Sequence, residues 1–557
     1  MAAQKKHEVW TDYDRRVPMR DGVELSADVY RPVESKSGER FPAILLRTPY
    51  NKTSPKSIRT ANYFAEKGYA VIWMDVRGRG DSDGAFIPYR NDGCDGYDAI
   101  EWCAAQPWCT GKVGTLGGSY LGHIQWLAAL QQPPHLATMV VLVTPSDPFV
   151  EWPTGAHGPM HLCWIHMTSG RVLQNAEVVD WVKIYEHLPL MTMDERAGRS
   201  SPVWREDLEH TRLDEYWEPL CYQNKLEQID LPVMHISGWY DDEQVGTPLN
   251  FIGMTTRGAS EFARKHQKLL VGPWGHQVNT SQKLGEVDFG PEALIDLQGM
   301  ELAWFDYWLK DQRDEPVVEP PVRIFVMGEN KWRDEQEWPL ARTRWTSYYL
   351  HSTRGANSRF GDGQLSTQEP DDEAPDRYRY DPARPVPFIT EPTSSQIGGP
   401  DDYAAIERRD DVLVYVTPPL EADLEVTGPV LLKLYAASSA RDTDFMAKLV
   451  DVHPTGFVQR LCDGMLRARF RNGMQRPELI EPGEVYLYEI DLWNTSQVFL
   501  KGHRIGLEIA SSAFPKYDRN LNTGEDLGTG TRMQVSEQTI FHDERRPSAL
   551  ILPVIPR

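Results

Sequence analysis

A serine, an aspartate and a histidine occur in this order in three segments that each resemble the end of a strand. Ser119 lies in GTLGGSYLGHIQ, Asp241 in SGWYDDE and His276 in VGPWGH. A serine hydroxyl is a weak nucleophile at neutral pH and needs a base to accept its proton. A histidine can be that base, and an aspartate can hold the imidazole in the right tautomer and stabilise its charged form. The three residues together predict acyl transfer through a covalent intermediate.

The glycines around Ser119 are typical of a sharp turn between a strand and a helix. The usual motif is G-x-S-x-G, but here Leu121 replaces the last glycine and Gly122 follows it. The motif alone leaves open that Ser119 is only a small residue in a cramped turn. Singly, His276 could be a surface histidine and Asp241 a helix cap. Their order after separate strands favours the catalytic interpretation, although the neighbouring Asp242 and Glu243 compete as the acid.

Alternating strand and helix patterns surround these three residues. Short apolar runs at residues 41–50, 70–78, 112–117 and 136–146 predict strands buried on both faces. Helical spacing separates them, and the strand pattern returns at residues 231–244 and 268–277. Such alternation predicts a parallel sheet with helices on both faces. Catalytic groups on a sheet of this kind lie at the carboxyl ends of the strands.

Two further units interrupt or follow this α/β pattern. Residues 147–230 lack strand runs and predict a helical cap, whereas many short strands after residue 317 predict an antiparallel jelly roll. A charged, proline-rich junction at 313–321 separates the first sheet from the jelly roll. We therefore expect a discontinuous α/β domain at 1–146 and 231–316, a helical insertion at 147–230 and a jelly roll at 317–557.

Composition limits the partners and the compartment. The chain has 557 residues, with 59 Lys and Arg against 81 Asp and Glu, a formal net charge of −22 that would repel nucleic acid or an anionic membrane. The six cysteines form no C-x-x-C pair, so we expect free thiols, no metal site and no cofactor. The N-terminus lacks an apolar signal segment, and the expected compartment is the cytoplasm. Whether the chain forms a homo-oligomer is left open.

Several stretches together resemble one family of serine hydrolases. It contains cocaine esterase, the X-Pro dipeptidyl-peptidases, the α-amino-acid ester hydrolases and the glutaryl cephalosporin acylases (CocE/NonD-type hydrolases). The matching stretches, which span nearly the whole chain, are DGVELSADVYRP, RTPYNK, MDVRGRGDSDG, GTLGGSYLG, SGWYDDE, VGPWGH, WFDYWLK, GPVLLKLYAASSARDTDF and HRIGLEIASSAFP. The resemblance implies an α/β-hydrolase fold with an inserted helical cap and a C-terminal jelly roll.

The resemblance also implies roles for individual residues. Ser119 is the nucleophile, Asp241 the acid and His276 the base, while Tyr50 of RTPY and the backbone N–H of Tyr120 form the oxyanion hole. Without the resemblance, Tyr50 would be interpreted as an aromatic packed under the cap. A donor prepared in advance at this point would contribute a few kcal/mol, on the order of 3, to transition-state binding.

The sequence says less about the substrate. Glu243 matches one carboxylate of the cluster that binds the amino group in α-amino-acid ester hydrolases, but Gln244 replaces another, and the third has no assignment. We therefore expect a small-molecule ester with a bulky or aromatic part, held by Glu243, Trp152, Trp164 and His157. The alternatives are an X-Pro dipeptidyl-peptidase, an α-amino-acid ester hydrolase or acylase, and, from another class, a non-catalytic protein that binds ligands through the jelly roll.

Overall fold

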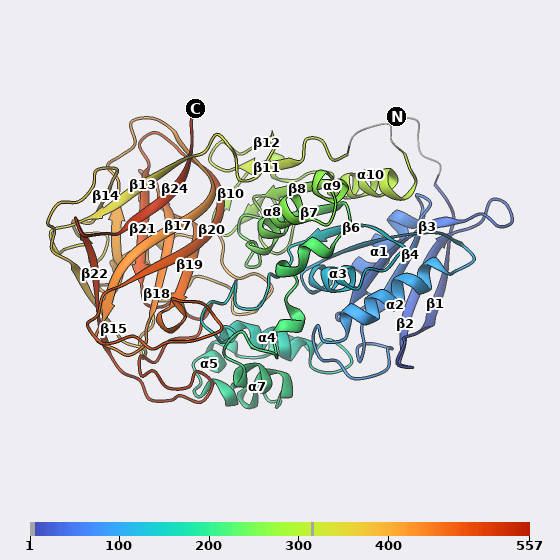
Figure 1. The fold of residues 1–557 in the computed structure, drawn as a ribbon, viewed down its shortest axis with the longest axis horizontal. Coiled ribbons are helices and arrows are strands. Elements are labelled where there is room, and N and C mark those ends of the chain that lie inside the picture. The colour runs from blue at the N-terminus through green and yellow to red at the C-terminus, as the bar shows by residue number, and fades with distance from the viewer. Residues whose placement is uncertain (1–5, 313–316) are drawn as a thin grey trace.

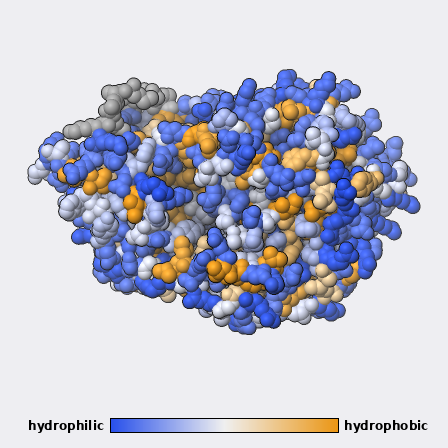
Figure 2. All heavy atoms as spheres, turned by 180° about the vertical axis from the view of Figure 1, so that it is seen from behind, coloured by the Kyte–Doolittle hydropathy of each residue, from blue (hydrophilic) through white to orange (hydrophobic). Residues whose placement is uncertain are grey.

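The computed structural model describes residues 6–312 and 317–557, so residues 313–316 of the predicted junction lie outside it. Two large sheets form opposite halves of the molecule, and the cap helices α4, α5 and α7 lie along the lower edge between them (Figure 1). No helix within these two ranges is long and apolar enough to cross a membrane. Hydrophilic residues cover most of the face in Figure 2, and hydrophobic residues appear there in small separate groups.

The first sheet has ten strands over the described residues, in the order β1-β2-β4-β3-β5-β6-β7-β8-β11-β12. Neighbouring strands are parallel from β4 through β11, and antiparallel pairs lie at both edges. The bounds are β1 (Val9–Pro18), β2 (Glu24–Pro32), β3 (Phe41–Thr48), β4 (Ala70–Asp75), β5 (Cys109–Gly118), β6 (Leu136–Leu142), β7 (Val233–Gly238), β8 (Gln267–Gly272), β11 (Val322–Val326) and β12 (Lys331–Glu335).

Helices cover both faces of this sheet. α1 and α10 pack on one face, α2, α8 and α9 on the other, and α3 contributes residues to both clusters. Both faces of the central strands are therefore buried, which explains their continuous apolar sequences. The bounds are α1 (Pro55–Ala65), α2 (Asp92–Ala104), α3 (Tyr120–Leu130), α8 (Gly246–Arg257), α9 (Glu261–Lys265) and α10 (Leu297–Leu309).

The chain between β6 and β7 forms short helices and 3-10 turns, in the interval where the sequence predicts a cap. Its helices are α4 (Pro159–Thr168), α5 (Trp181–Tyr185), α6 (Met193–Arg196) and α7 (Pro202–Glu209). Their apolar side chains form one cluster with residues of the C-terminal half, such as Phe388 and Met446. The cap therefore packs against the second sheet.

The second sheet is antiparallel apart from one parallel pairing of β14 with β16. Within the described residues it contains the twelve strands β13 (Arg344–His351), β14 (Gln364–Ser366), β15 (Asp376–Tyr380), β16 (Leu413–Val416), β17 (Leu424–Ser438), β18 (Asp444–Val452), β19 (Val458–Arg467), β20 (Tyr486–Phe499), β21 (Arg504–Ala510), β22 (Ser536–Asp543), β23 (Arg546–Pro547) and β24 (Ala549–Ile555). A separate ribbon joins β9 (Lys283–Leu284) to β10 (Val287–Asp288).

One segment differs from the sequence prediction. The sequence assigns residues 323–328 to the jelly roll, but β11 pairs in parallel with β8 and so extends the first sheet. β11 is also linked to the second half, because Met327 forms a bridge with Gln497. A short apolar strand looks the same in sequence whichever sheet it joins, and only its pairing partner distinguishes the two cases.

Candidate active site

Ser119 lies at the turn between β5 and α3, in a backbone conformation that side chains rarely adopt. Its φ and ψ angles are 58° and −129°. Its N–H group donates to the carbonyl oxygens of Leu142, at 3.0 Å, and Val143, at 2.9 Å, at the end of the neighbouring strand β6. These bonds stabilise a strained turn whose hydroxyl faces a cavity, as a nucleophile requires.

The glycines near Ser119 are required by close packing. A Cβ atom at Gly117 would lie 2.5 Å from the Cβ of Leu121, in the first turn of α3. A Cβ atom at Gly122 would lie 2.4 Å from the hydroxyl of Thr144. The close contact between α3 and the end of β6 therefore requires a glycine at position 122, one residue later than in the usual motif.

His276 and Asp241 form a hydrogen-bonded pair on the loops after β8 and β7. The distance from His276 Nδ1 to Asp241 Oδ1 is 2.8 Å, whereas Asp242 Oδ1 lies 3.7 Å from the same nitrogen. Asp241 is fully buried and also accepts a hydrogen bond from Ser237 Oγ at 2.9 Å. The geometry therefore favours Asp241 over Asp242 as the partner of the imidazole.

The surroundings of His276 favour its charged form. Burial lowers the pKa of the imidazole, but the hydrogen bond and charge of Asp241, with the charges of Asp242 and Glu151, outweigh this and raise it to about 9. An imidazolium stabilised in this way is what a general base needs after it has taken a proton.

One cavity of about 1100 Å³ connects most of the predicted site residues. Ser119, His276 and Tyr50 line it, and so do the candidate substrate-binding residues Glu243, Trp152, Trp164 and His157. The Ser119 hydroxyl lies beside the Tyr50 hydroxyl and the Glu243 carboxyl group. Among the hydrogen bonds of the described residues, none joins this hydroxyl to the His276 ring. Catalytic hydrogen bonds often tighten only when substrate is bound.

Tyr50 is positioned as a hydrogen-bond donor toward the cavity. Its hydroxyl oxygen accepts a hydrogen bond from Trp164 Nε1 at 3.1 Å, which leaves the hydroxyl proton for another acceptor. Burial raises the pKa of Tyr50 to about 12, so the proton is retained at neutral pH. Tyr120 begins α3, where backbone N–H groups have no partner inside the helix. The Tyr120 side chain is buried and donates to Asp92 Oδ2 at 2.5 Å.

A group of buried carboxyl groups in the same cavity was only partly predicted. Glu151, Asp242 and Glu243 all line the cavity, and Asp242 Oδ1 and Glu243 Oε2 are buried without a hydrogen-bond partner among the described residues. Burial and the neighbouring carboxylates raise the pKa of Glu151 to about 8 and that of Glu243 well above its usual range. Glu151 lies near Glu243, in the segment at the start of the cap where the sequence left a third carboxylate unassigned. Glu151 and Glu243 are far apart in the sequence, so no local sequence pattern indicates that they lie together.

Gln244, which replaces an expected carboxylate, has a structural contact instead. Its side chain donates to the carbonyl oxygen of Asn494 at 2.6 Å and accepts from the Asn494 N–H group at 3.2 Å. In the same way, Gln396 accepts a hydrogen bond from the His276 N–H group at 2.8 Å and donates to the Tyr240 carbonyl at 3.2 Å. The C-terminal half therefore holds the two loops that carry Asp241 and His276.

Comparisons with known proteins agree with this architecture. The family described as X-Pro dipeptidyl-peptidase (S15 family) matches residues 21–278, and the X-Pro dipeptidyl-peptidase C-terminal non-catalytic domain matches residues 317–551. A cocaine esterase from Rhodococcus sp. (strain MB1 Bresler) is 38% identical over 577 residues, which cover 97% of this chain and 98% of the relative. The chain belongs to the S15 family.

Solved structures resemble this S15 family member along its whole length. An α-amino acid ester hydrolase labelled with selenomethionine has a TM-score of 0.84 and 26% identity, covering 100% of this chain and 98% of its own. An aminopeptidase from a marine sediment archaeon, Thaumarchaeota archaeon, has a TM-score of 0.85 at 24% identity, covering 100% and 97%, and supports the fold.

These findings confirm two predictions made from the sequence. The fold is an α/β hydrolase with an inserted helical cap and a β-rich C-terminal domain, and the S15 family member is an enzyme, a serine hydrolase. The alternative of a non-catalytic binding protein is not supported. The individual roles of Ser119, Asp241 and His276 and the domain boundaries stay predictions.

Proposed function

We propose that this enzyme cleaves carboxylic esters through an acyl-enzyme intermediate formed on Ser119. The observation that carries the proposal is the pair of His276 and Asp241, hydrogen-bonded at 2.8 Å, in which His276 lines the same cavity as a serine at a strained turn. The similarity to cocaine esterase supports an ester as the substrate. The cytoplasm stays the proposed compartment.

The proposed reaction has two steps. Ser119 Oγ attacks the ester carbonyl carbon while His276 accepts the hydroxyl proton, and the Tyr50 hydroxyl and the Tyr120 N–H group donate to the carbonyl oxygen as it becomes negative. The bond between the acyl carbon and the alcohol oxygen then breaks, and His276 gives its proton to that oxygen. Water then attacks the acyl carbon while His276 accepts its proton, and the bond to Ser119 Oγ breaks as His276 gives that proton to Oγ, which releases the acid and restores Ser119.

The cavity supports a substrate with a bulky or aromatic part. Trp152, Trp164 and Trp217 line it, and a volume of about 1100 Å³ is large for a small acyl group. Aromatic walls bind flat apolar groups by burial and stacking. We propose that the part of the cavity lined by these tryptophans binds the larger of the two groups, acyl or alcohol, of the ester.

A fluorophosphonate probe tests the proposed nucleophile. The wild-type enzyme should be labelled, and Ser119→Ala should lose the label while keeping the circular dichroism spectrum of the wild type. A panel of nitrophenyl esters beside an Ala-Pro anilide tests the reaction. Preference for the anilide, or labelling that survives in Ser119→Ala, would refute the proposal.

The carboxyl groups beside Ser119 support a second candidate, hydrolysis of esters or amides that carry a free α-amino group. An ammonium group near Glu243 and Glu151 would favour their charged forms and be attracted by them, and Glu243 Oε2 has no hydrogen-bond partner among the described residues. The phenylalanine methyl ester should then react faster than the 3-phenylpropionate methyl ester, and Glu243→Gln should remove the difference. Glu301→Gln is the matched control, because Glu301 is a buried carboxyl group elsewhere in the cavity. Equal rates for the two esters would reject this candidate.

A further inference from the structure

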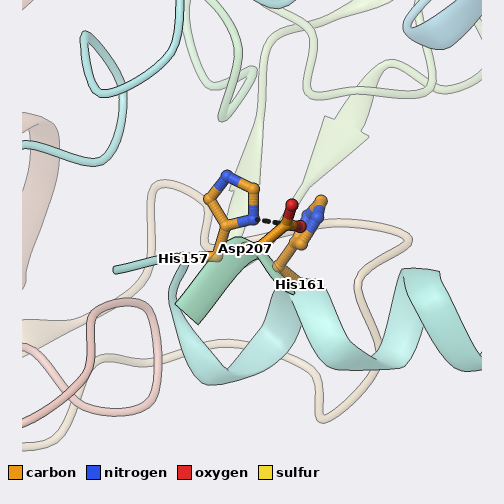
Figure 3. Close-up of side chains that lie close together, drawn as sticks. All are labelled: His157, His161 and Asp207. Atoms are coloured by element: carbon orange, nitrogen blue, oxygen red, sulfur yellow. Dashed lines mark ion pairs between the residues drawn. The ribbon is translucent and has the colours of Figure 1, made fainter. Parts of the chain in front are cut away.

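Two histidines and an aspartate of the cap lie together in the wall of the same cavity. His157 precedes α4, His161 lies in the first turn of α4, and Asp207 lies on α7. Figure 3 shows the three side chains turned toward one another. One donor atom from each residue lies within 4.8 Å of the other two. The mechanism proposed for ester cleavage uses none of the three.

The spacing of these groups is wrong for a hydrogen bond. His157 Nδ1 and Asp207 Oδ2 are 3.6 Å apart, beyond the usual range for an N–H···O bond. The nitrogen is nevertheless buried and has no hydrogen-bond partner among the described residues. In a tetrahedral zinc site with bonds of about 2.0–2.2 Å, two ligand atoms stand roughly 3.4 Å apart. The observed distance is therefore close to that of two ligands of one ion.

The local environment prepares these side chains as ligands. Both imidazole rings lie in the cavity wall, and a neutral imidazole nitrogen offers its lone pair to a metal ion. Asp207 Oδ1 accepts a hydrogen bond from the Tyr216 hydroxyl at 2.7 Å, which orients the carboxyl group and leaves Oδ2 toward His157. Such an outer partner is typical of carboxylate ligands.

Aromatic side chains hold both imidazole rings in place. His161 stacks on Trp164 with ring centroids 5.5 Å apart, and His157 packs against Trp217 at 5.3 Å. The two histidine rings themselves lie 4.0 Å apart. Rings fixed in this way lose little conformational freedom on binding an ion, which favours affinity.

We propose that His157, His161 and Asp207 bind one divalent transition-metal ion of the zinc class. Two imidazole nitrogens and a carboxylate oxygen suit Zn²⁺, Co²⁺ or Ni²⁺ and do not suit a hard ion such as Ca²⁺, which prefers oxygen ligands. Three protein ligands leave a fourth position, and all three residues line the cavity. The open position would bind water or an oxygen or nitrogen donor of a molecule in the cavity.

A bound ion would also be connected to the oxyanion tyrosine. Trp164 stacks on His161 and donates its indole N–H group to the Tyr50 hydroxyl at 3.1 Å. Fixing the His161 ring therefore fixes the indole that orients Tyr50. The metal would in this way act as a positioning element of the cavity, in addition to offering a ligand position.

A second cluster in the C-terminal half provides a comparison. Asp451, His453 and His503 also bring three donor atoms close together. There, however, His503 Nδ1 already bonds to Asp451 Oδ1 at 2.8 Å, and Gln497 Nε2 donates to Asp451 Oδ2 at 2.9 Å. Both carboxylate oxygens are in use, so we assign no ion to this cluster and use it as the control.

Calorimetric titration of the full-length, metal-stripped enzyme with Zn²⁺ tests the proposal, in protein made without a polyhistidine tag. The wild type should bind one equivalent. His161→Gln and Asp207→Asn should each weaken binding by about 100-fold or more, because loss of a direct ligand costs at least as much as loss of an outer partner, whereas His453→Gln should bind as the wild type does. Absence of binding to the wild type, unchanged binding to His161→Gln, or loss in His453→Gln would each overturn the assignment.

A spectroscopic titration keeps the proposal testable if these variants do not fold. Co²⁺ bound to the wild type by two nitrogens and an oxygen should give visible ligand-field bands without a thiolate charge-transfer band. It should also quench part of the tryptophan fluorescence, since Trp164 and Trp217 lie against the ligands. A Co²⁺ titration that gives no visible bands would overturn the assignment.

Discussion

Replacing Tyr50 by phenylalanine isolates one hydrogen bond of the proposed transition state. The variant removes the hydroxyl that accepts from Trp164 Nε1 and, in the proposed mechanism, donates to the developing oxyanion. With a pKa of about 12, only about one hydroxyl in 10⁴ is ionised at pH 8, so nearly every molecule has the proton to donate. Removal of the hydroxyl should therefore lower the activity of nearly every enzyme molecule.

The expected magnitude follows from the position of this donor. Loss of one oxyanion donor in a water-poor site lowers kcat by about 10²–10³-fold, or about 2.7–4 kcal/mol. The substrate carbonyl is weakly charged before attack, so we expect KM to change by less than about threefold. The free Trp164 indole N–H group adds a smaller penalty of about 1 kcal/mol.

Steady-state hydrolysis of a nitrophenyl ester, together with the rate of fluorophosphonate labelling, measures this effect. Tyr89→Phe is the matched control, because Tyr89 lines the same cavity and loses the same atom. Its kcat should stay within about threefold of the wild type. A Tyr50→Phe enzyme within tenfold of the wild type, or an equal loss in Tyr89→Phe, would refute the oxyanion assignment.

Four further perturbations test other parts of the site and its support. Because only neutral His276 accepts a proton, kcat/KM of the wild type should rise with pH with an apparent pKa near 9. Asp241→Asn should lower kcat and shift this apparent pKa to lower pH. A wild-type value near 6.5 would contradict the assignment. Gly122→Ala places a Cβ atom 2.4 Å from a threonine hydroxyl and should destabilise the fold by about 1–3 kcal/mol in urea unfolding, and an unchanged midpoint would argue against tight packing there. Gln396→Leu leaves the backbone N–H group of the histidine loop unpaired and should slow fluorophosphonate labelling about tenfold, so wild-type labelling would exclude a positioning role. Deletion of residues 317–557 should expose apolar surface and cause aggregation in size-exclusion chromatography, and a monomeric, active truncation would contradict the packing described.

The sequence predicted the central sheet and the order of the candidate catalytic residues because these signals are local. Buried parallel strands have continuous apolar sequences, and the segment 112–130 contains a strand, a glycine turn and a helix in one window. Ser119, Asp241 and His276 each follow such a strand. Their meeting at one edge of the sheet follows from the geometry of parallel strands.

Features that depend on distant contacts could not be predicted in the same way. Glu151 approaches Glu243 because the strands that precede them, β6 and β7, are neighbours in the sheet, and Asp207 reaches His157 because α7 packs beside α4. Gln244 was interpreted as a missing carboxylate, although it links two halves of the chain through Asn494. Local sequence patterns do not identify the partner of a buried polar side chain when that partner lies in a distant segment of the chain.

The contacts from Gln396 and Asn494 to the catalytic loops also have a consequence for protein synthesis. A ribosome completes Ser119, Asp241 and His276 well before it adds Gln396, at about 5–20 residues per second. For that interval, on the order of ten seconds, the loops lack the hydrogen bonds that hold them in the finished protein. An incomplete chain would therefore have the proposed nucleophile without a firmly held base, and we expect full hydrolytic activity only after the last third of the chain has been translated and has packed against the first two thirds.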